Sequence, residues 1–342
     1  MTERKRIIMT REELRSRVDG IAFMTVTPFF DNGEIDYEGY RQNVRFLVDK
    51  IKANPCKCTI TPCGSNGEFP HLTDDEQKEI IRICVEEVNG LVPVVAGTGR
   101  ASTKRTIEIS KYAQEVGADG VQVILPYYFV PTVDGMLEHY KELADAIDIG
   151  IVIYNNPAFS GSWIKPAQMK KLIEMTGDKI VAVKENTPHL MLFNAMAKAL
   201  RGTGVKLLSG FGEQWFAYQF PWGADGLATP FGNFFPEFPI EFKKAADNYD
   251  IETMRAWLAK MERYYGFLGK IGAARGDTGM LDKPGGNIYG EGNVRFGVLK
   301  EAMNLVGLHG GDMRAPLKLH MTEEERAELR DILKELGFDV KN

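Results

Sequence analysis

Short apolar runs alternate with amphipathic helical patterns up to about residue 245, and this alternation limits the fold of the chain more than any other feature. The eight runs span residues 20–27, 56–63, 92–97, 120–125, 149–155, 180–185, 205–209 and 223–228. Several are almost wholly apolar, as parallel strands covered on both faces by helices must be. Eight such repeats in 342 residues predict a (β/α)8 TIM barrel rather than an open, doubly wound sheet.

The pattern changes after Pro236, where helical segments follow one another without a further strand. We therefore expect a barrel over residues 1–245 that carries the active site, and a C-terminal helical domain over 246–342. A Gly-rich insert at 266–292 interrupts that domain and is expected to be a loop. Capping-box patterns predict that helices begin after Thr73 and after Thr322.

Charge and cysteine usage exclude several classes of protein. The net charge is −5 with both signs interspersed, which argues against nucleic-acid binding, and no apolar run reaches the ~18 residues of a membrane span. The cysteines are Cys56, Cys58, Cys63 and Cys84; three crowd one segment, which suits a reducing, cytoplasmic location rather than a disulfide framework. Their spacing lacks the second half of a zinc site, so we expect no metal.

Lys184 closes the apolar run 180–185 and is the first candidate for chemistry. A lysine that must leave water loses part of its preference for the charged form, so its pKa falls and its amine becomes a nucleophile. Such an amine can attack a ketone or aldehyde to form a Schiff base. The alternative is a strand-end lysine whose ammonium group reaches the surface.

Tyr154 ends the preceding apolar run, 149–155. If the two strands are neighbours, a phenol and an amine face the same cavity at the carboxyl ends of the barrel strands, where barrel enzymes hold their active sites. A phenol needs a hydrogen-bonded partner to act near neutral pH. Tyr154 is otherwise a rim tyrosine whose hydroxyl lies in water.

Four motifs resemble those of one family in order and spacing: Gly64-Ser65-Asn66-Gly67-Glu68, Tyr154-Asn155-Asn156-Pro157 followed by Gly161, Val183-Lys184-Glu185, and the segment 307–317. The chain resembles the dihydrodipicolinate synthase and N-acetylneuraminate lyase family of class I, Schiff-base aldolases. The resemblance covers about residues 20–329. Each motif alone is weak, but the four in order are specific.

The resemblance implies roles for individual residues. Lys184 would form an imine with pyruvate or a larger 2-oxo acid, and Tyr154 would be the acid and base. Ser65 would link Tyr154 to a second tyrosine, Tyr128, which would reach in from a neighbouring subunit. Backbone N–H groups near Gly64, Ser65 and Asn66 would hold the carboxylate of the 2-oxo acid. No cofactor is implied, and the family's assemblies lead us to expect a homotetramer, a dimer of dimers.

Two positions depart from the family's patterns. Members that condense pyruvate with aspartate semialdehyde carry an arginine where this chain has Phe159, and an aromatic ring cannot pair with a carboxylate. Sialic-acid lyases carry an Asp-Glu pair after the seventh strand, where this chain has Gly212 and Glu213. Gly210, Glu213 and Thr229 follow the last two strands and are expected to contact substrate, with Phe159 as an apolar wall.

The sequence therefore predicts a lyase or aldolase that joins pyruvate to, or releases it from, a 2-keto-3-deoxy sugar acid or related substrate. Dihydrodipicolinate synthase and 2-keto-3-deoxy acid dehydratase activities remain alternatives, since the same enamine serves all three reactions. A protein that binds a 2-oxo acid without turning it over is the alternative outside the enzymes.

Overall fold

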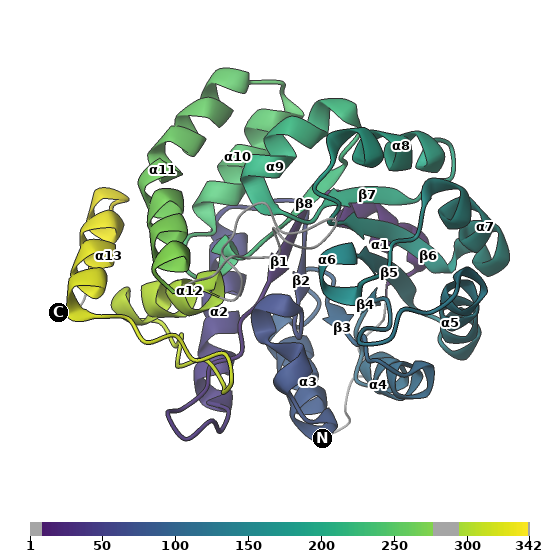
Figure 1. Cartoon of the computed structure of the whole chain (residues 1–342), viewed down its shortest axis with the longest axis horizontal. Helices are drawn as coiled ribbons and strands as arrows, with labels where there is room; N and C mark the ends of the chain where they lie inside the picture. Colours follow the sequence, from purple (N-terminus) through teal and green to yellow (C-terminus); the bar gives the residue numbers. More distant parts are fainter. Residues whose placement is uncertain (1–8, 276–293, 341–342) are drawn as a thin grey trace.

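Eight short strands pair in parallel into a single sheet whose two ends meet. The computed structural model describes residues 9–275 and 294–340. The strands follow one another in the order β2-β1-β8-β7-β6-β5-β4-β3. The sheet closes where Ile60, in β2, forms a parallel bridge with Val94, just before β3. The predicted (β/α)8 barrel is confirmed, and helices surround the strands (Figure 1).

The strands lie inside the eight predicted apolar runs or within a residue of them. They are β1 (Ile21–Met24), β2 (Cys58–Thr61), β3 (Val95–Gly97), β4 (Gly120–Ile124), β5 (Gly150–Asn155), β6 (Ile180–Glu185), β7 (Lys206–Ser209) and β8 (Gly226–Thr229). The helices are α1 (Arg11–Val18), α2 (Tyr37–Ala53), α3 (Asp74–Val88), α4 (Thr103–Glu115), α5 (Val133–Ala146), α6 (Pro157–Ser160), α7 (Pro166–Thr176), α8 (Leu190–Leu200), α9 (Gly212–Gln219), α10 (Glu237–Asp247), α11 (Ile251–Ala274), α12 (Val294–Leu305) and α13 (Glu323–Glu335).

Helix α1 packs against the amino-terminal end of the barrel. Its Leu14 and Val18 form one buried cluster with strand residues that include Val152 and Ala182. Gly150 makes this close approach possible, because a Cβ there would lie 2.8 Å from a Leu14 methyl group. The barrel interior is therefore apolar at this end.

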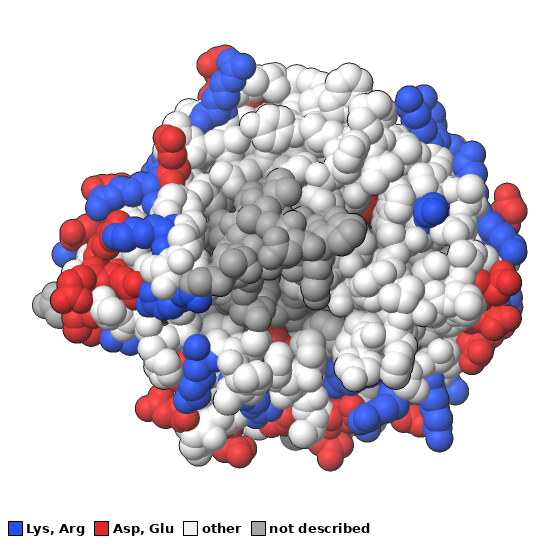
Figure 2. Space-filling model, in the orientation of Figure 1, with Lys and Arg blue, Asp and Glu red and all other residues white. Residues whose placement is uncertain are grey.

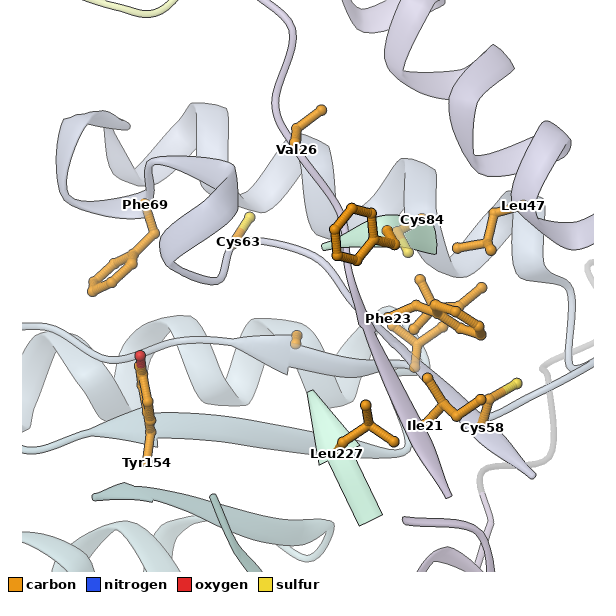
Figure 3. Close-up of a cluster of buried hydrophobic side chains, with 14 of the residues drawn as sticks. Ile21, Phe23, Val26, Leu47, Cys58, Cys63, Phe69, Cys84, Tyr154 and Leu227 are labelled. Carbon is orange, nitrogen blue, oxygen red and sulfur yellow. The ribbon is translucent and has the colours of Figure 1, made fainter. Parts of the chain in front are cut away.

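The cysteines belong largely to the core between the barrel and its helices. Cys58, Cys63 and Cys84 are buried, and Cys58 lies beside Ile21, its partner in the β1–β2 register (Figure 3). All four cysteines are free thiols. Within residues 9–275 and 294–340, no three His, Cys, Asp or Glu side chains gather as a metal site would require.

Two predicted helix starts are confirmed. Thr73 and Thr322 each accept a hydrogen bond from the backbone of the glutamate three residues later, and the glutamate side chain accepts one in return. These reciprocal bonds satisfy backbone N–H groups that have no partner inside the helix.

The expected loop over 266–292 is wrong in its first part, because α11 continues to Ala274. Phe267, Leu268 and Ile271 are buried on the inner face of that helix, and their packing outweighs the low helix propensity of the nearby glycines. Residues 276–292 of that prediction lie outside the described residues. The division into 1–245 and 246–342 falls within α10 and stays a proposal. None of the described helices combines the length and the apolarity that a membrane span needs.

Candidate active site

Lys184 and Tyr154 lie side by side inside the carboxyl end of the barrel. They are register partners on β6 and β5, and both side chains are only 4% exposed. The Lys184 Nζ lies 4.0 Å from the centroid of the Tyr154 ring and 3.8 Å from the Sδ of Met24 on β1. The strand neighbourhood expected from the sequence therefore holds, and the lysine points into the barrel.

The surroundings of Lys184 favour the neutral amine. Burial lowers its pKa because the ammonium form loses its hydration, and the positive charge of Arg295 acts in the same direction. The nearby Tyr154 acts in the opposite direction. The net effect is a lowered pKa, which a nucleophilic lysine requires near neutral pH.

The Tyr154 hydroxyl has two hydrogen-bond partners. The Asn156 Nδ2 donates to it at 2.7 Å, and the Ser65 Oγ lies 3.5 Å away. Burial acts to raise the pKa of this phenol, but Lys184, both hydrogen bonds and the charge of Arg295 act against burial. The pKa of Tyr154 is lowered as a result, so the group can give up and regain a proton more readily than an ordinary phenol.

A tight loop after β2 carries Ser65. Ser65–Gly67 forms one 3-10 turn, and the residues on either side of the Gly64–Gly67 segment, Cys63 and Glu68, have positive φ values of 56° and 52°. Glu68 is held by the buried Lys300 of α12, and its other carboxylate oxygen accepts from the Arg314 backbone. The C-terminal part of the chain thus fixes the loop that points Ser65 at Tyr154.

One pocket collects most of the residues that the sequence singled out. It is lined by Ser65, Asn66, Tyr154, Lys184, Gly210, Glu213 and Thr229. Gly64 lines a small adjoining cavity together with Ser65 and Tyr154.

Two predicted residues are not brought to this pocket within one chain. Tyr128 is 88% exposed and Phe159 is 40% exposed, and neither lines the pocket. The expectation that Phe159 forms an apolar wall therefore has no support in the single chain. Tyr128 was expected to act from a neighbouring subunit, and that stays a prediction.

Glu213 is a buried acid in the first turn of α9. Burial raises its pKa to about 7, against the opposing effect of a hydrogen bond with Thr229. Its Oε1 has no hydrogen-bond partner among the described residues. An unpaired buried carboxyl oxygen that lines a pocket is available to a polar ligand.

Sequence reasoning missed the wall that the C-terminal helices contribute. Tyr264, Tyr265 and Leu268 of α11 line the pocket, as do Arg295, Phe296 and Leu299 of α12. No motif marks these positions, because they follow the last strand by many residues. Asn156 was also missed as a partner of Tyr154, although it stands inside the quoted Tyr-Asn-Asn-Pro motif.

The described part of the face in Figure 2 is mostly uncharged, and Lys, Arg, Asp and Glu gather mainly around its edge. Both signs alternate along that edge.

A family model and the sequences of known proteins both match most of this chain. Residues 17–265 match the model of the dihydrodipicolinate synthetase family. A 4-hydroxy-tetrahydrodipicolinate synthase of Methanococcus aeolicus is 31% identical over 321 residues, which cover 94% of this chain and 100% of the relative. The same-named protein of Methanocaldococcus jannaschii is 31% identical over 319 residues, 93% of this chain and 99% of the relative.

Solved structures support the same family assignment. Dihydrodipicolinate synthase from Aquifex aeolicus has a TM-score of 0.79 and 30% identity, covering 94% of this chain and 99% of that one. The synthase from Thermotoga maritima has a TM-score of 0.77 and 27% identity, covering 93% and 98%. Sequence, barrel and pocket lead to one conclusion: this chain belongs to the dihydrodipicolinate synthetase family.

Proposed function

We propose that this chain is a class I lyase that forms an imine between the Lys184 Nζ and the ketone carbon of pyruvate or another 2-oxo acid. It then forms or breaks the adjacent carbon–carbon bond. One observation carries the proposal: a buried lysine with a lowered pKa stands over the ring of a buried tyrosine whose hydroxyl is hydrogen-bonded. Membership of a family whose relatives are named as synthases supports it.

The chemistry follows from these groups. The neutral amine attacks the ketone carbon, and the resulting carbinolamine loses its hydroxyl as water after Tyr154 supplies a proton. The protonated imine then accepts the electron pair of the breaking bond and becomes an enamine. In the reverse direction the enamine attacks an aldehyde, and Tyr154 gives the new alkoxide a proton. No metal or cofactor is required, because the imine nitrogen is the electron sink.

Neighbouring groups hold and tune the reactants. Ser65 lies within reach of the Tyr154 hydroxyl and continues the proton path away from Lys184. Backbone N–H groups around Gly64 and Asn66 are proposed to bind the carboxylate of the 2-oxo acid, as successive N–H groups in a tight turn can. Asn66 lines the pocket beside Ser65, and its side-chain amide is proposed to contact the same end of the ligand.

Two classes of second substrate compete. The relatives carry the name of 4-hydroxy-tetrahydrodipicolinate synthase, and this favours aspartate semialdehyde over the sugar acid expected from the sequence. Phe159 in place of the expected arginine argues in the other direction. The buried carboxyl of Glu213 beside Thr229 suits a substrate hydroxyl, which keeps a 2-keto-3-deoxy sugar acid as the second candidate.

An exposed apolar segment supports the proposed homotetramer. Tyr128, Phe129 and Val130 are 88%, 80% and 66% exposed, more than isolated surface residues of this kind require. Tyr128 also has a φ of 83°, an unfavourable value for a bulky residue that a neighbouring contact can hold in place. A partner subunit that covers this segment would carry Tyr128 toward another chain's pocket. A cytoplasmic location stays a prediction.

Reductive trapping tests the imine. Borohydride added with pyruvate should leave one adduct on Lys184, seen as a mass increase on the peptide that contains it. Lys184→Met should lose the adduct, whereas Lys179→Met, which changes a lysine just before the start of β6, should keep it. Trapping elsewhere, or none in the wild-type protein, would contradict the proposed function.

Turnover assays separate the remaining candidates. Pyruvate with aspartate semialdehyde tests the synthase reaction, and a panel of 2-keto-3-deoxy sugar acids tests cleavage through pyruvate release. Loss of water without carbon–carbon cleavage would identify a dehydratase. An adduct on Lys184 without turnover of any of these substrates would favour the non-catalytic 2-oxo acid binder.

A further inference from the structure

Arg295 is a cation in the active-site pocket that the sequence motifs did not mark. It lies near the start of α12 and lines the pocket together with Lys184, Tyr154 and Glu213. Its Nε is buried and has no hydrogen-bond partner in the part of the chain that the structure describes. Among the described residues no carboxylate pairs with it, whereas Arg275 and Arg314 each form an ion pair with a glutamate.

The charge of Arg295 reaches the reacting groups. It contributes to lowering the pKa of both Lys184 and Tyr154, which places the guanidinium within electrostatic range of both. A partly buried cation that lacks a counterion loses hydration without a compensating partner. An anion that pairs with the guanidinium in the pocket would compensate for that lost hydration.

The remaining wall of the pocket is largely aromatic and aliphatic. Phe211, Phe231 and Leu299 line it, as does Phe296, over whose ring the Arg295 guanidinium lies at 4.9 Å. Stacking on Phe296 restrains the guanidinium plane, and a planar fork of donors suits two-point binding of a carboxylate. A ligand that contacts both this wall and the guanidinium has an apolar part and a carboxylate, and Glu213 and Thr229 remain available to a hydroxyl or another polar group.

We propose that Arg295 binds a carboxylate of the second substrate, so that the aldehyde joined to or released from the 2-oxo acid itself carries an acid group. The inference rests on the proposed function and narrows its substrate class. Position 159 holds an exposed phenylalanine outside the pocket, so α12 supplies the cation that this position lacks. Aldehydes without an acid group, such as simple polyol aldehydes, leave Arg295 unpaired.

Matched, unreactive probes test this without relying on turnover. Butyrate is compared with butyramide, and benzoate with benzamide, by titration into the full-length protein saturated with pyruvate. Saturation keeps the probes out of the site proposed for the pyruvate carboxylate. Wild-type protein should bind each carboxylate at least about tenfold more tightly than its amide, because hydrogen bonds to charged groups are the stronger ones.

Variants at position 295 identify the residue responsible. Arg295→Met should lose most of the carboxylate preference, about 10-fold or more, with little change in amide binding. Arg295→Lys should restore part of the preference, since it keeps the charge without the planar fork. Arg255→Met, which changes an exposed arginine of α11, is the matched control and should behave as wild type.

Each failure has a distinct meaning. Wild-type protein that traps pyruvate on Lys184 but does not discriminate between the probes overturns the inference and leaves the proposed function standing. The inference is also overturned if Arg295→Met loses affinity for the carboxylate probes and for the amide probes to the same extent. If Arg295→Met does not fold, Arg295→Lys is compared with Arg295→Gln. The inference then requires the ratio of carboxylate to amide affinity to be higher in the lysine variant than in the glutamine variant. Absence of pyruvate trapping in wild-type protein counts against the proposed function itself.

Discussion

At the scale of single residues, the pocket lowers the pKa of both Lys184 and Tyr154, but burial has opposite effects on the two groups. Lys184 becomes a better nucleophile because it is buried, while Tyr154 becomes a better acid despite being buried. Each group shifts the pKa of the other, since the ammonium form of Lys184 favours the phenolate and the phenolate favours the ammonium. Neither side chain would have the same reactivity if the other were removed.

Tyr154→Phe tests the acid–base role. We expect kcat/KM to fall by about 10²–10⁴, the usual contribution of a positioned proton donor, with the fold intact. Steady-state kinetics and a thermal melt measure the two effects. Tyr127→Phe is the matched control, because Tyr127 packs on Phe69 outside the main pocket. Activity near the wild-type level in Tyr154→Phe would remove the phenol from the mechanism.

Glu213 gives the fold a pH dependence. Its pKa is raised to about 7, so the folded protein holds this proton over a range in which the unfolded chain has released it. The stability that this provides is complete below the unfolded pKa of about 4.3 and is lost as the pH rises to about 7.

Glu213→Gln should therefore show a flatter fall in unfolding free energy between about pH 4.5 and 7 than the wild-type protein. Urea unfolding at a series of pH values measures this. Glu185, whose pKa is raised to about 8, remains in both proteins and cancels in the difference. Glu262→Gln, an exposed change on α11, should leave the slope unaltered. The prediction would be contradicted if the unfolding free energies of Glu213→Gln and the wild type fell equally steeply with rising pH.

At the scale of elements, α12 serves both the pocket and the loop after β2. Arg295 faces the pocket from its start, and Lys300, less than two turns later, forms a buried ion pair with Glu68. The pair is almost completely excluded from solvent, and Lys300 also lies 4.5 Å from the centroid of the Phe29 ring. The position of the Ser65 loop therefore depends on a helix from the far end of the chain.

Lys300→Met should lower the free energy of unfolding by about 3–5 kcal/mol, because it leaves the Glu68 carboxylate buried without its cation. Denaturant unfolding measures the loss. The double variant Lys300→Met, Glu68→Gln should recover much of it, since no uncompensated charge remains. Lys318→Met, which removes a partly exposed lysine, is the control. A single variant as stable as wild type would mean that the pair contributes little.

At the scale of the whole molecule, the exposed apolar segment that begins at Tyr128 is a feature that a single chain leaves unexplained. Phe129→Asp should shift the assembly toward smaller species in sedimentation, because a carboxylate cannot be buried unpaired in an interface. Phe30→Asp changes an exposed phenylalanine elsewhere and should leave the assembly unchanged. Tyr128→Phe should keep the assembly and lower activity. A monomer with full activity would contradict both proposals.

The barrel could be predicted from local patterns because nearly all strand residues are buried and several helices begin at a readable capping signal. The capping boxes at Thr73 and Thr322 are examples. The proximity of Lys184 and Tyr154 followed from the same patterns, since consecutive parallel strands of a barrel are neighbours. The length of α11 was not predictable, because tertiary packing outweighed the glycines in its last turns.

By itself, then, the sequence determined the order of strands and helices, the strand ends that carry chemistry and the amine–phenol pair. Each of these depends on interactions between residues close in the chain or on adjacent repeats. Only the tertiary structure decided that α12 places Arg295 in the pocket and Lys300 beneath the Ser65 loop. The contact between Lys300 and Glu68 joins residues 232 positions apart, and no local pattern of charge or hydrophobicity specifies which distant surface a helix will cover.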